Sequence, residues 1–206
     1  MREMLTQLGE EDIKVILSSF SCPVNKDVEI FLRERAIEFN IQGISATHLI
    51  FASYKGAQSL IGYFTLSNKS IEIPTRNLSD KFRKRLRRFA QNDNNKHLIQ
   101  LAIPLIGQLG KNYLNDLNKL ITGDELLKMA LEQVHESQRI LGGRFVYLEC
   151  EDTPKLIQFY VDNGFVKFND RPLDDDEVLV MKGTRLVQML RYVKDGEYDQ
   201  PYLNII

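Results

Sequence analysis

A polar loop that leads from an apolar run into a strongly capped helix is the first candidate for chemistry in this sequence. The run over residues 97–107 is mostly apolar, and beyond it Thr122 and Glu125 have the Thr-x-x-Glu spacing of a capping box. Such a helix start offers unpaired backbone N–H groups and the positive end of the helix dipole to an anion. The spacing therefore indicates either an anion-binding loop or a plain helix start.

Glycine is scarce in this loop, where only Gly123 stands at the helix start. A loop for a nucleoside triphosphate would need Gly-Lys-Ser/Thr, and a dinucleotide-binding turn would need three glycines. Neither pattern occurs here, so the sequence excludes these two classes of nucleotide site.

A second motif lies in the segment FVYLECEDTPKLIQFYVDNGFVKF. It begins as a strand, continues through Thr153-Pro154 as a helix start with a capping hydroxyl, and has a helix that ends at Gly164. Its FYVDNGF resembles the Phe-Tyr-x-x-x-Gly-Phe signature of the GCN5-related N-acetyltransferases, and residues 118–123 align with the pyrophosphate loop of that superfamily. The resemblance implies a mixed, largely antiparallel α/β sheet flanked by helices, and acetyl-coenzyme A (acetyl-CoA) as the co-substrate.

The same resemblance implies roles for individual residues. Tyr160 would be the general acid that returns a proton to the coenzyme A thiolate, because a phenol with a reference pKa of about 10 stays protonated at neutral pH. Backbone groups at the strand end would pair with the pantetheine arm, and amides at the helix start would wrap the pyrophosphate. Thr153 would touch the coenzyme or serve only as a helix cap. The cofactor-binding residues are thus Leu109, Gly110, Lys111, Leu120, Ile121, Thr122, Gly123, Asp124, Glu125 and Thr153.

No general base, nucleophile or metal site follows from the sequence. Glu149 and Glu151 precede Tyr160 on a strand, where carboxylates are usually only solvated, and a water-mediated route needs no dedicated base. Cys150 fits a buried small hydrophobic residue better than a nucleophile. The three histidines are too scattered for metal-ligand spacing, so no metal is predicted.

Three stretches resemble a bacterial branch of this superfamily that includes toxins acetylating aminoacyl-tRNA. They are FSCPVNKDVEIFLRERA, LIGYFTLS and LIGQLGKN. Within the third stretch and just after it, Gln108 stands where those toxins have arginine and Asn112 where they have aspartate. The branch implies tRNA as a further partner.

The segment KFRKRLRR carries the densest positive charge of the chain. Ser79 is a suitable N-cap, and Phe82, Leu86 and Phe89 have the spacing of one apolar helix face. The remaining positions would form an outward cationic surface, which indicates either contact with nucleic-acid phosphates or a solvated face. These basic residues are Lys81, Arg83, Lys84, Arg85, Arg87 and Arg88.

The order of strands and helices predicts an α/β sheet with helices on its faces, preceded by two short helices. The predicted strands are residues 47–53, 59–67, 97–107, 144–151 and 178–181. A bulge or a splayed strand end is expected at Pro104, because proline cannot donate to a ladder. Residues 184–194 are expected to form a last helix.

Composition limits the remaining choices. The chain has 206 residues, 43% hydrophobic and 27% charged, with a formal net charge of −1, which excludes a wholly basic nucleic-acid coat. We expect one domain over residues 1–206, with a C-terminal extension from about residue 184. Cys22 and Cys150 lack metal spacing, and no apolar run is long enough for a bilayer, so a cytoplasmic protein without membrane contact is expected.

The sequence therefore predicts an acetyl-CoA-dependent N-acetyltransferase that acts on a primary amine by direct attack. Two alternatives stay open: toxin-like acetylation of aminoacyl-tRNA through the basic helix 81–88, and a non-catalytic acyl-CoA-binding module. A homodimer is also left open.

Overall fold

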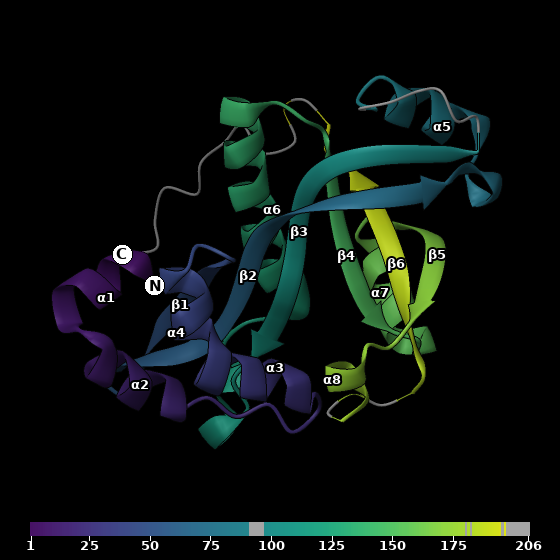
Figure 1. Cartoon of the computed structure of the whole chain (residues 1–206). Coiled ribbons are helices and arrows are strands. Elements are labelled where there is room, and N and C mark those ends of the chain that lie inside the picture. The colour runs from purple at the N-terminus through teal and green to yellow at the C-terminus, as the bar shows by residue number, and fades with distance from the viewer. Residues whose placement is uncertain (91–96, 180, 182, 195, 197–206) are drawn as a thin grey trace.

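A six-stranded sheet in the order β1-β2-β3-β4-β6-β5 forms the centre of the molecule (Figure 1). The structure is a computed structural model that describes residues 1–206 except 91–96, 180, 182, 195 and 197–206. Only the β3–β4 pair is parallel among the described strands, so the predicted mixed, largely antiparallel sheet is confirmed. The strands are β1 (Ala46–Tyr54), β2 (Ala57–Pro74), β3 (Leu98–Lys111), β4 (Phe145–Glu151), β5 (Val166–Pro172) and β6 (Arg185–Tyr192).

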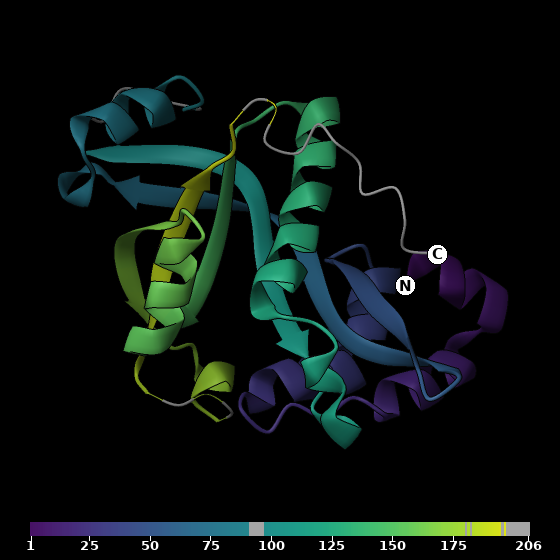
Figure 2. The same ribbon diagram turned by 180° about the vertical axis from the view of Figure 1, so that it is seen from behind.

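Helices cover both faces of this sheet (Figures 1 and 2). One face, here the α6 face, carries α6 (Gly123–Leu141) and α7 (Pro154–Asp162). The opposite face, here the α5 face, carries the N-terminal helices, α5 and α8. None of the described helices has the length and apolar character needed to cross a membrane. The other helical elements are α1 (Arg2–Leu8), α2 (Glu10–Ser18), α3 (Lys26–Ile30), the π-helical turn η1 (Phe31–Arg35), α4 (Ala36–Ile41), η2 (Thr75–Asn77), α5 (Asp80–Arg87), η3 (Leu114–Lys119) and α8 (Asp175–Val178).

Alternation along β4 divides the core between the two faces. Val146 and Leu148 pack with α6 and α7, whereas Phe145 and Tyr147 pack with the cluster under α5. A third cluster joins the N-terminal helices to β1 and β2. β4 is therefore buried on both sides, which fits its nearly continuous apolar sequence.

The irregularity expected at Pro104 occurs three residues later. Pro104 keeps its register opposite Asn68, and the shift in the β2–β3 ladder falls between Gln108 and Ile106, so that Gly107 is the extra residue. The bulge expected at Pro104 is therefore wrong, but the expected splayed strand end does occur close by, because β3 leaves β4 after Ile106. A glycine suits the bulge because a Cβ there would lie 3.1 Å from Thr65 Oγ1.

The C-terminal part differs from the predicted elements. Residues 185–192 form β6, which pairs with both β4 and β5, so the last helix and the extension expected from about residue 184 are wrong. The apolar residues of β6 lie on both faces of the sheet, with Val187 and Met189 in one cluster and Leu190 in another, and this two-sided burial imitates a helical pattern. The strand expected over residues 178–181 is also wrong at its described positions, because Val178 ends α8 and Leu179 and Met181 lie in a turn and a bend; residue 180 is outside the described residues.

Candidate active site

The parallel strands β3 and β4 part soon after they meet. They pair only at Leu105–Tyr147 and Ile106–Leu148. Beyond these two pairs, β3 continues to Lys111 beside β2, and β4 continues to Glu151 beside β6. The bulge at Gly107 lies at the point of separation. The middle of the sheet therefore contains an opening in which each bordering strand has one unpaired backbone edge.

Alternate residues of β3 direct their backbone N–H and C=O groups toward β2, and the residues between them direct theirs into the opening. The N–H of Asn112, just after β3, donates to the carbonyl oxygen of Ile61 at 2.8 Å. Because an antiparallel ladder alternates, Gly110 also directs its N–H and C=O toward β2, while Leu109 and Lys111 direct theirs into the opening. The resemblance assigns Leu109, Gly110 and Lys111 to the pantetheine arm, and of these Leu109 and Lys111 present free backbone groups to the opening.

Gly110 has a packing role instead. A Cβ at this position would lie 2.3 Å from Val28 Cγ1 and 3.3 Å from Phe20 Cζ. The absence of a side chain lets α3 approach the end of β3 closely, so Gly110 positions the wall of the opening on the α5 face.

The N-terminus of α6 meets the same opening, and its capping box is confirmed. Thr122 Oγ1 accepts from the Glu125 N–H at 3.1 Å, and Glu125 Oε2 accepts from the Thr122 N–H at 2.7 Å. The Leu120 N–H is also used, by the Leu117 carbonyl at 3.0 Å. Among residues 120–125, the amides without an acceptor in the described chain are those of Ile121, Gly123 and Asp124. These three are the amides that remain for an anion.

Lys111 holds this loop in place with its side chain. Its Nζ donates to the carbonyl oxygens of Asn118 at 3.0 Å and Ile121 at 3.1 Å. The ammonium thus ties the end of β3 to the segment before α6, and it leaves a positive charge near the free amides.

We expect Lys111→Met to weaken acetyl-CoA binding roughly tenfold, because it removes two charge-assisted hydrogen bonds that order the loop. Isothermal titration calorimetry measures the effect. Lys119→Met is the matched control, since Lys119 lies in the same loop but is exposed and pairs only with Asp116 at 3.1 Å. Equal affinities for the two variants would contradict the role of Lys111.

Two contacts that sequence reasoning missed join α6 to α7. The Asn163 side chain donates to Asp124 Oδ1 at 2.8 Å, and a Cβ on Gly123 would lie 3.3 Å from Phe159. Gly123 therefore lets the α6 N-terminus lie against the helix that carries Tyr160. Phe159 and Asn163 both belong to the FYVDNGF motif, but their partners lie about forty residues away and left no local signal.

Thr153 occupies the N-cap position of α7, and Pro154 is the first helical residue, as predicted. The capping hydroxyl is a wrong prediction, because the Thr153 side chain makes no capping hydrogen bond. Thr153 is exposed, so its hydroxyl is free to contact a ligand.

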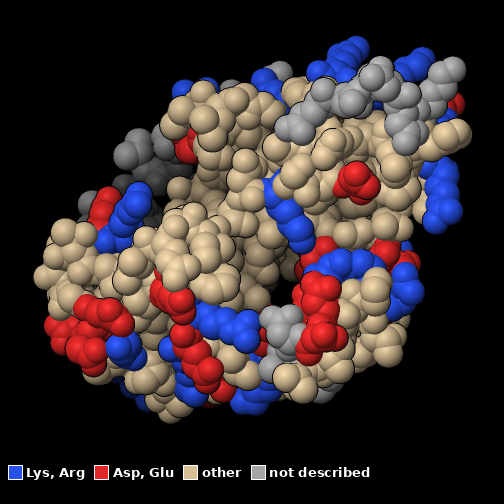
Figure 3. Space-filling model, in the orientation of Figure 1, with Lys and Arg blue, Asp and Glu red and all other residues tan. Residues whose placement is uncertain are grey.

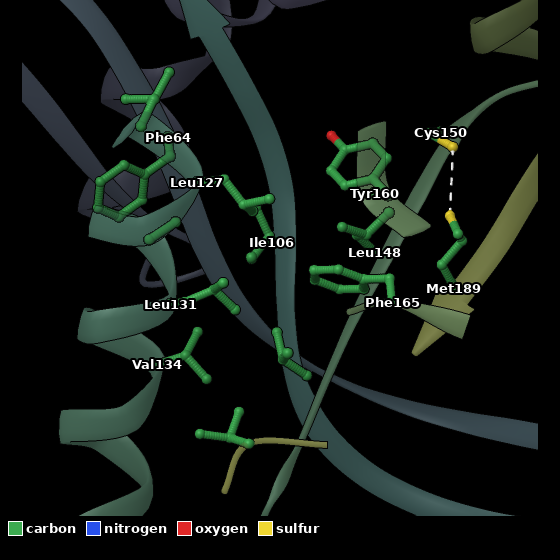
Figure 4. Packing of buried hydrophobic residues seen from close by; sticks show 14 of the residues in the cluster. Phe64, Ile106, Leu127, Leu131, Val134, Leu148, Cys150, Tyr160, Phe165 and Met189 are labelled. Carbon is green, nitrogen blue, oxygen red and sulfur yellow. Dashed lines mark hydrogen bonds between the residues drawn. The ribbon is translucent and has the colours of Figure 1, made fainter. Parts of the chain in front are cut away.

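Tyr160 lies on α7 at the α6 face of the opening, with its ring buried among Phe159, Phe165 and Leu148. Figure 4 shows its hydroxyl directed away from Leu148 and Phe165, and no described residue hydrogen-bonds to it. Burial, with a smaller contribution from Cys150, raises the pKa of Tyr160 above its ordinary value. The phenol therefore keeps its proton at neutral pH.

The glycine of the motif shapes the turn after Tyr160. Gly164 has φ of +81°, which a residue with a side chain adopts only with strain, and the Phe165 N–H then donates to the Tyr160 carbonyl at 3.0 Å. This turn folds Phe165 back against the Tyr160 ring, with centroids 5.7 Å apart. The Phe-Tyr-x-x-x-Gly-Phe pattern thus fixes the position of the tyrosine.

The α5 face of the opening is hollowed, with basic and acidic side chains around the rim (Figure 3). Glu149, the first β4 residue beyond the paired section, belongs to this face. Arg171 Nη2 lies 2.7 Å from Glu149 Oε2, and Tyr147 and Gln188 also donate to this carboxylate. Arg171 also binds Glu177 at 2.7 Å and so attaches α8 to the sheet.

This network excludes Glu149 as a general base. Burial alone would raise its pKa, but the hydrogen bonds from Arg171, Tyr147 and Gln188 outweigh burial and lower the pKa to about 2. A carboxylate of such low basicity, with its oxygens already occupied, is a poor proton acceptor. The expectation that the strand carboxylates are simply solvated is therefore wrong for Glu149.

The basic helix is confirmed as α5, and Ser79 caps it by accepting from the Phe82 N–H at 3.3 Å. Its cations do not form one uniform outward surface. Arg83 pairs with Asp80, Arg85 stacks over the Tyr192 ring at 4.7 Å, and Arg87 is half-buried. The exposed cations are Lys81, Lys84 and Arg88.

A mixed sheet with one parallel pair, whose strands part beside a capped helix N-terminus, is the fold that the resemblance to the GCN5-related N-acetyltransferases implies. No protein-family model matches the chain, and no curated protein sequence is similar to it.

Several solved structures, toxins among them, share this fold. A Tyr-to-Phe mutant of KacT is similar with a TM-score of 0.57 and 16% identity, covering 84% of this chain and 85% of that one. AtaT complexed with acetyl-methionyl-tRNAfMet has a TM-score of 0.55 and 15% identity, covering 84% and 85%. A Tyr-to-Phe mutant of AtaT, bound to acetyl-CoA and the C-terminus of the antitoxin AtaR, has a TM-score of 0.51 and 14% identity, covering 84% and 83%. At these identities the likeness is one of fold.

Proposed function

We propose that this chain transfers an acetyl group from acetyl-CoA to a primary amine. The observation that carries the proposal is the opening between β3 and β4. It offers the free backbone groups of Leu109 and Lys111 to a pantetheine arm, the amides of Gly123 and Asp124 to a pyrophosphate, and the Tyr160 hydroxyl to the thioester. A structure of similar fold that holds acetyl-CoA adds support.

The reaction needs an amine, a thioester and one proton donor. The neutral amine nitrogen attacks the thioester carbonyl carbon, a C–N bond forms, and the C–S bond breaks. The departing thiolate takes the Tyr160 proton, the proton released by the amine passes to solvent, and solvent then returns a proton to the Tyr160 phenolate. Because burial raises the pKa of Tyr160, this proton is present until the thiolate develops.

Titration of the protein with acetyl-CoA tests this proposal. We expect saturable binding with a Kd in the micromolar range, on the order of −8 kcal/mol. No binding at about 1 mM acetyl-CoA, where even a −4 kcal/mol interaction is half saturated, would contradict it. Binding without turnover over a panel of amines and aminoacyl-tRNAs would instead indicate a non-catalytic acyl-CoA-binding module.

Aminoacyl-tRNA is a second candidate for the acceptor, and α5 is the observation that favours it. Lys81, Lys84 and Arg88 are exposed on this helix. Phe82 of α5 packs on Phe145 with ring centroids 5.7 Å apart, so α5 lies on the face of the sheet that carries Glu149 and the hollow. A polyanion on α5 would therefore share a face with the opening. The fold of AtaT complexed with acetyl-methionyl-tRNAfMet adds support.

For a tRNA acceptor, we expect the combined variant Lys81→Glu, Lys84→Glu, Arg88→Glu to weaken tRNA binding by roughly two to three decades. The dependence of log Kd on log salt should become shallower, because phosphate contacts disappear. Filter binding of tRNA at several salt concentrations measures both effects. Acetyl-CoA binding should be unchanged, since these side chains are remote from the α6 N-terminus.

A charge-matched triple on other surfaces controls for net charge. Lys14→Glu, Lys55→Glu and Arg139→Glu change exposed cations outside α5. If both triples lose the same tRNA affinity, α5 is only a solvated basic face, and the acceptor is then a small molecule or a protein amine.

A further inference from the structure

Lys69 lies beside the opening on the α5 face of the sheet. Lys69 of β2 has its Nζ 3.8 Å from Glu149 Oε2 and 5.9 Å from the centroid of the Tyr147 ring. Glu149 is the first β4 residue after the last β3–β4 pair, so the Lys69 ammonium lies where the strands part. Its side chain is 43% exposed, so solvent reaches it.

The Lys69 ammonium donates no hydrogen bond to any described residue. Glu149 already accepts from Tyr147, Gln188 and both nitrogens that Arg171 offers, and the Lys69 distance of 3.8 Å is too long for a hydrogen bond. No described residue accepts a hydrogen bond from Lys69. The network thus holds a lysine in place by charge attraction while its three donors stay available.

The other polar side chains of this network already make hydrogen bonds to one another or to neighbouring residues. Arg171 uses its donors on Glu149, Glu177 and neighbouring oxygens, and Gln188 bonds both Tyr147 and Asn169. Lys69 is therefore the group of this cluster that can bind a ligand entering from the α5 face.

We propose that Lys69 is a specificity-determining residue that binds a phosphate of the amine acceptor; this inference rests on the proposed acetyl transfer, with a nucleotide-linked amine as acceptor. An ammonium with free donors fits a phosphate oxygen. The exposed cations of α5 lie on the same face of the sheet, so a phosphate chain can run from them to Lys69 and bring its amine into the opening. The acceptor amine then approaches from the face opposite Tyr160, which lies on the α6 face.

The test compares two probes that differ in phosphate. The first is an RNA minihelix that ends in CCA and carries a methionyl group on its 3′ end through a stable amide. The second is methionine amide. Lys69→Gln should raise the Kd of the minihelix, measured without acetyl-CoA, roughly tenfold, and should lower its salt slope by about 0.7 to 0.9. The KM for methionine amide in acetyl transfer should change less than about twofold.

Lys55→Gln is the matched control, because Lys55 also lies over a tyrosine ring, that of Tyr54 at 5.1 Å, but at the β1–β2 turn. It should bind the minihelix like the parent protein. The proposal is overturned if Lys69→Gln keeps the parent's Kd and salt slope, if it loses methionine amide to the same extent, or if the parent does not bind the minihelix. Failure of the acetyltransferase proposal is recognised separately, by a parent protein that binds no acetyl-CoA.

Discussion

Tyr160→Phe should lower kcat by roughly two to four decades while leaving the Kd for acetyl-CoA nearly unchanged. The substitution removes the only atom of this side chain that can protonate a thiolate, and it keeps the ring that packs on Phe159 and Phe165. Steady-state kinetics with an identified amine, together with calorimetry, measure the two quantities. The pKa of Tyr160 is raised, so its own deprotonation should not limit kcat at any pH below its ordinary value of 10.0.

Tyr192→Phe controls for the loss of a phenol elsewhere, since the Tyr192 ring carries the stacked Arg85 rather than facing the opening. It should keep the parental kcat. A Tyr160→Phe enzyme with unchanged kcat would remove Tyr160 from its role, and one that also loses acetyl-CoA would indicate a structural effect instead.

Asn112→Asp should destabilise the fold by about 3 to 5 kcal/mol. Asn112 is wholly buried, and its amide group donates to the carbonyls of Leu60 at 2.8 Å and Ser19 at 3.1 Å. Its side-chain oxygen accepts from the backbone N–H of Ser21 at 2.9 Å. A carboxylate cannot donate, so two buried carbonyls would face a negative charge.

Thermal unfolding should show a fall in Tm on the order of 10 °C. The loss of stability should become smaller as pH falls. Burial raises the pKa of the introduced carboxyl group, so at low pH the group is protonated, carries no charge and can donate one hydrogen bond. Asn68→Asp, at an exposed position of β2, is the control and should shift Tm little. Equal shifts for both variants would show that the hydrogen bonds of Asn112 contribute little.

Elements with local signals could be predicted from the sequence. The capping box at Thr122, the Thr153-Pro154 start and the Ser79 cap each depend on residues within one helical turn, and all three helix starts occur in the structure. The segment of the Phe-Tyr-x-x-x-Gly-Phe motif likewise predicted the helix that carries Tyr160 and ends before Gly164.

Features that depend on distant partners could not be predicted. The sequence of β6 resembled that of a helix because this strand lies between two others and buries apolar residues on both of its faces. β5 (Val166–Pro172) was not predicted, because only Phe168 among its residues is fully buried and the strand therefore shows no apolar alternation. The network at Glu149 joins residues from four strands, so no spacing in the sequence indicates it. Roles in coenzyme binding stay predictions for the residues that line the opening.

The short β3–β4 contact also has a mechanical consequence. The sheet consists of two contiguous blocks of chain, β1 to β3 and β4 to β6, and only two backbone pairs connect them within the sheet. α6 spans the junction on one face, and Lys69 with Glu149 bridges it on the other. A pantetheine arm lying along the edge of β3 would add backbone pairing to one block while its pyrophosphate engaged the helix that crosses to the other. The bound coenzyme would then link the two blocks, and the hydrogen exchange of backbone amides at the ends of β3 and β4 would slow together when it binds.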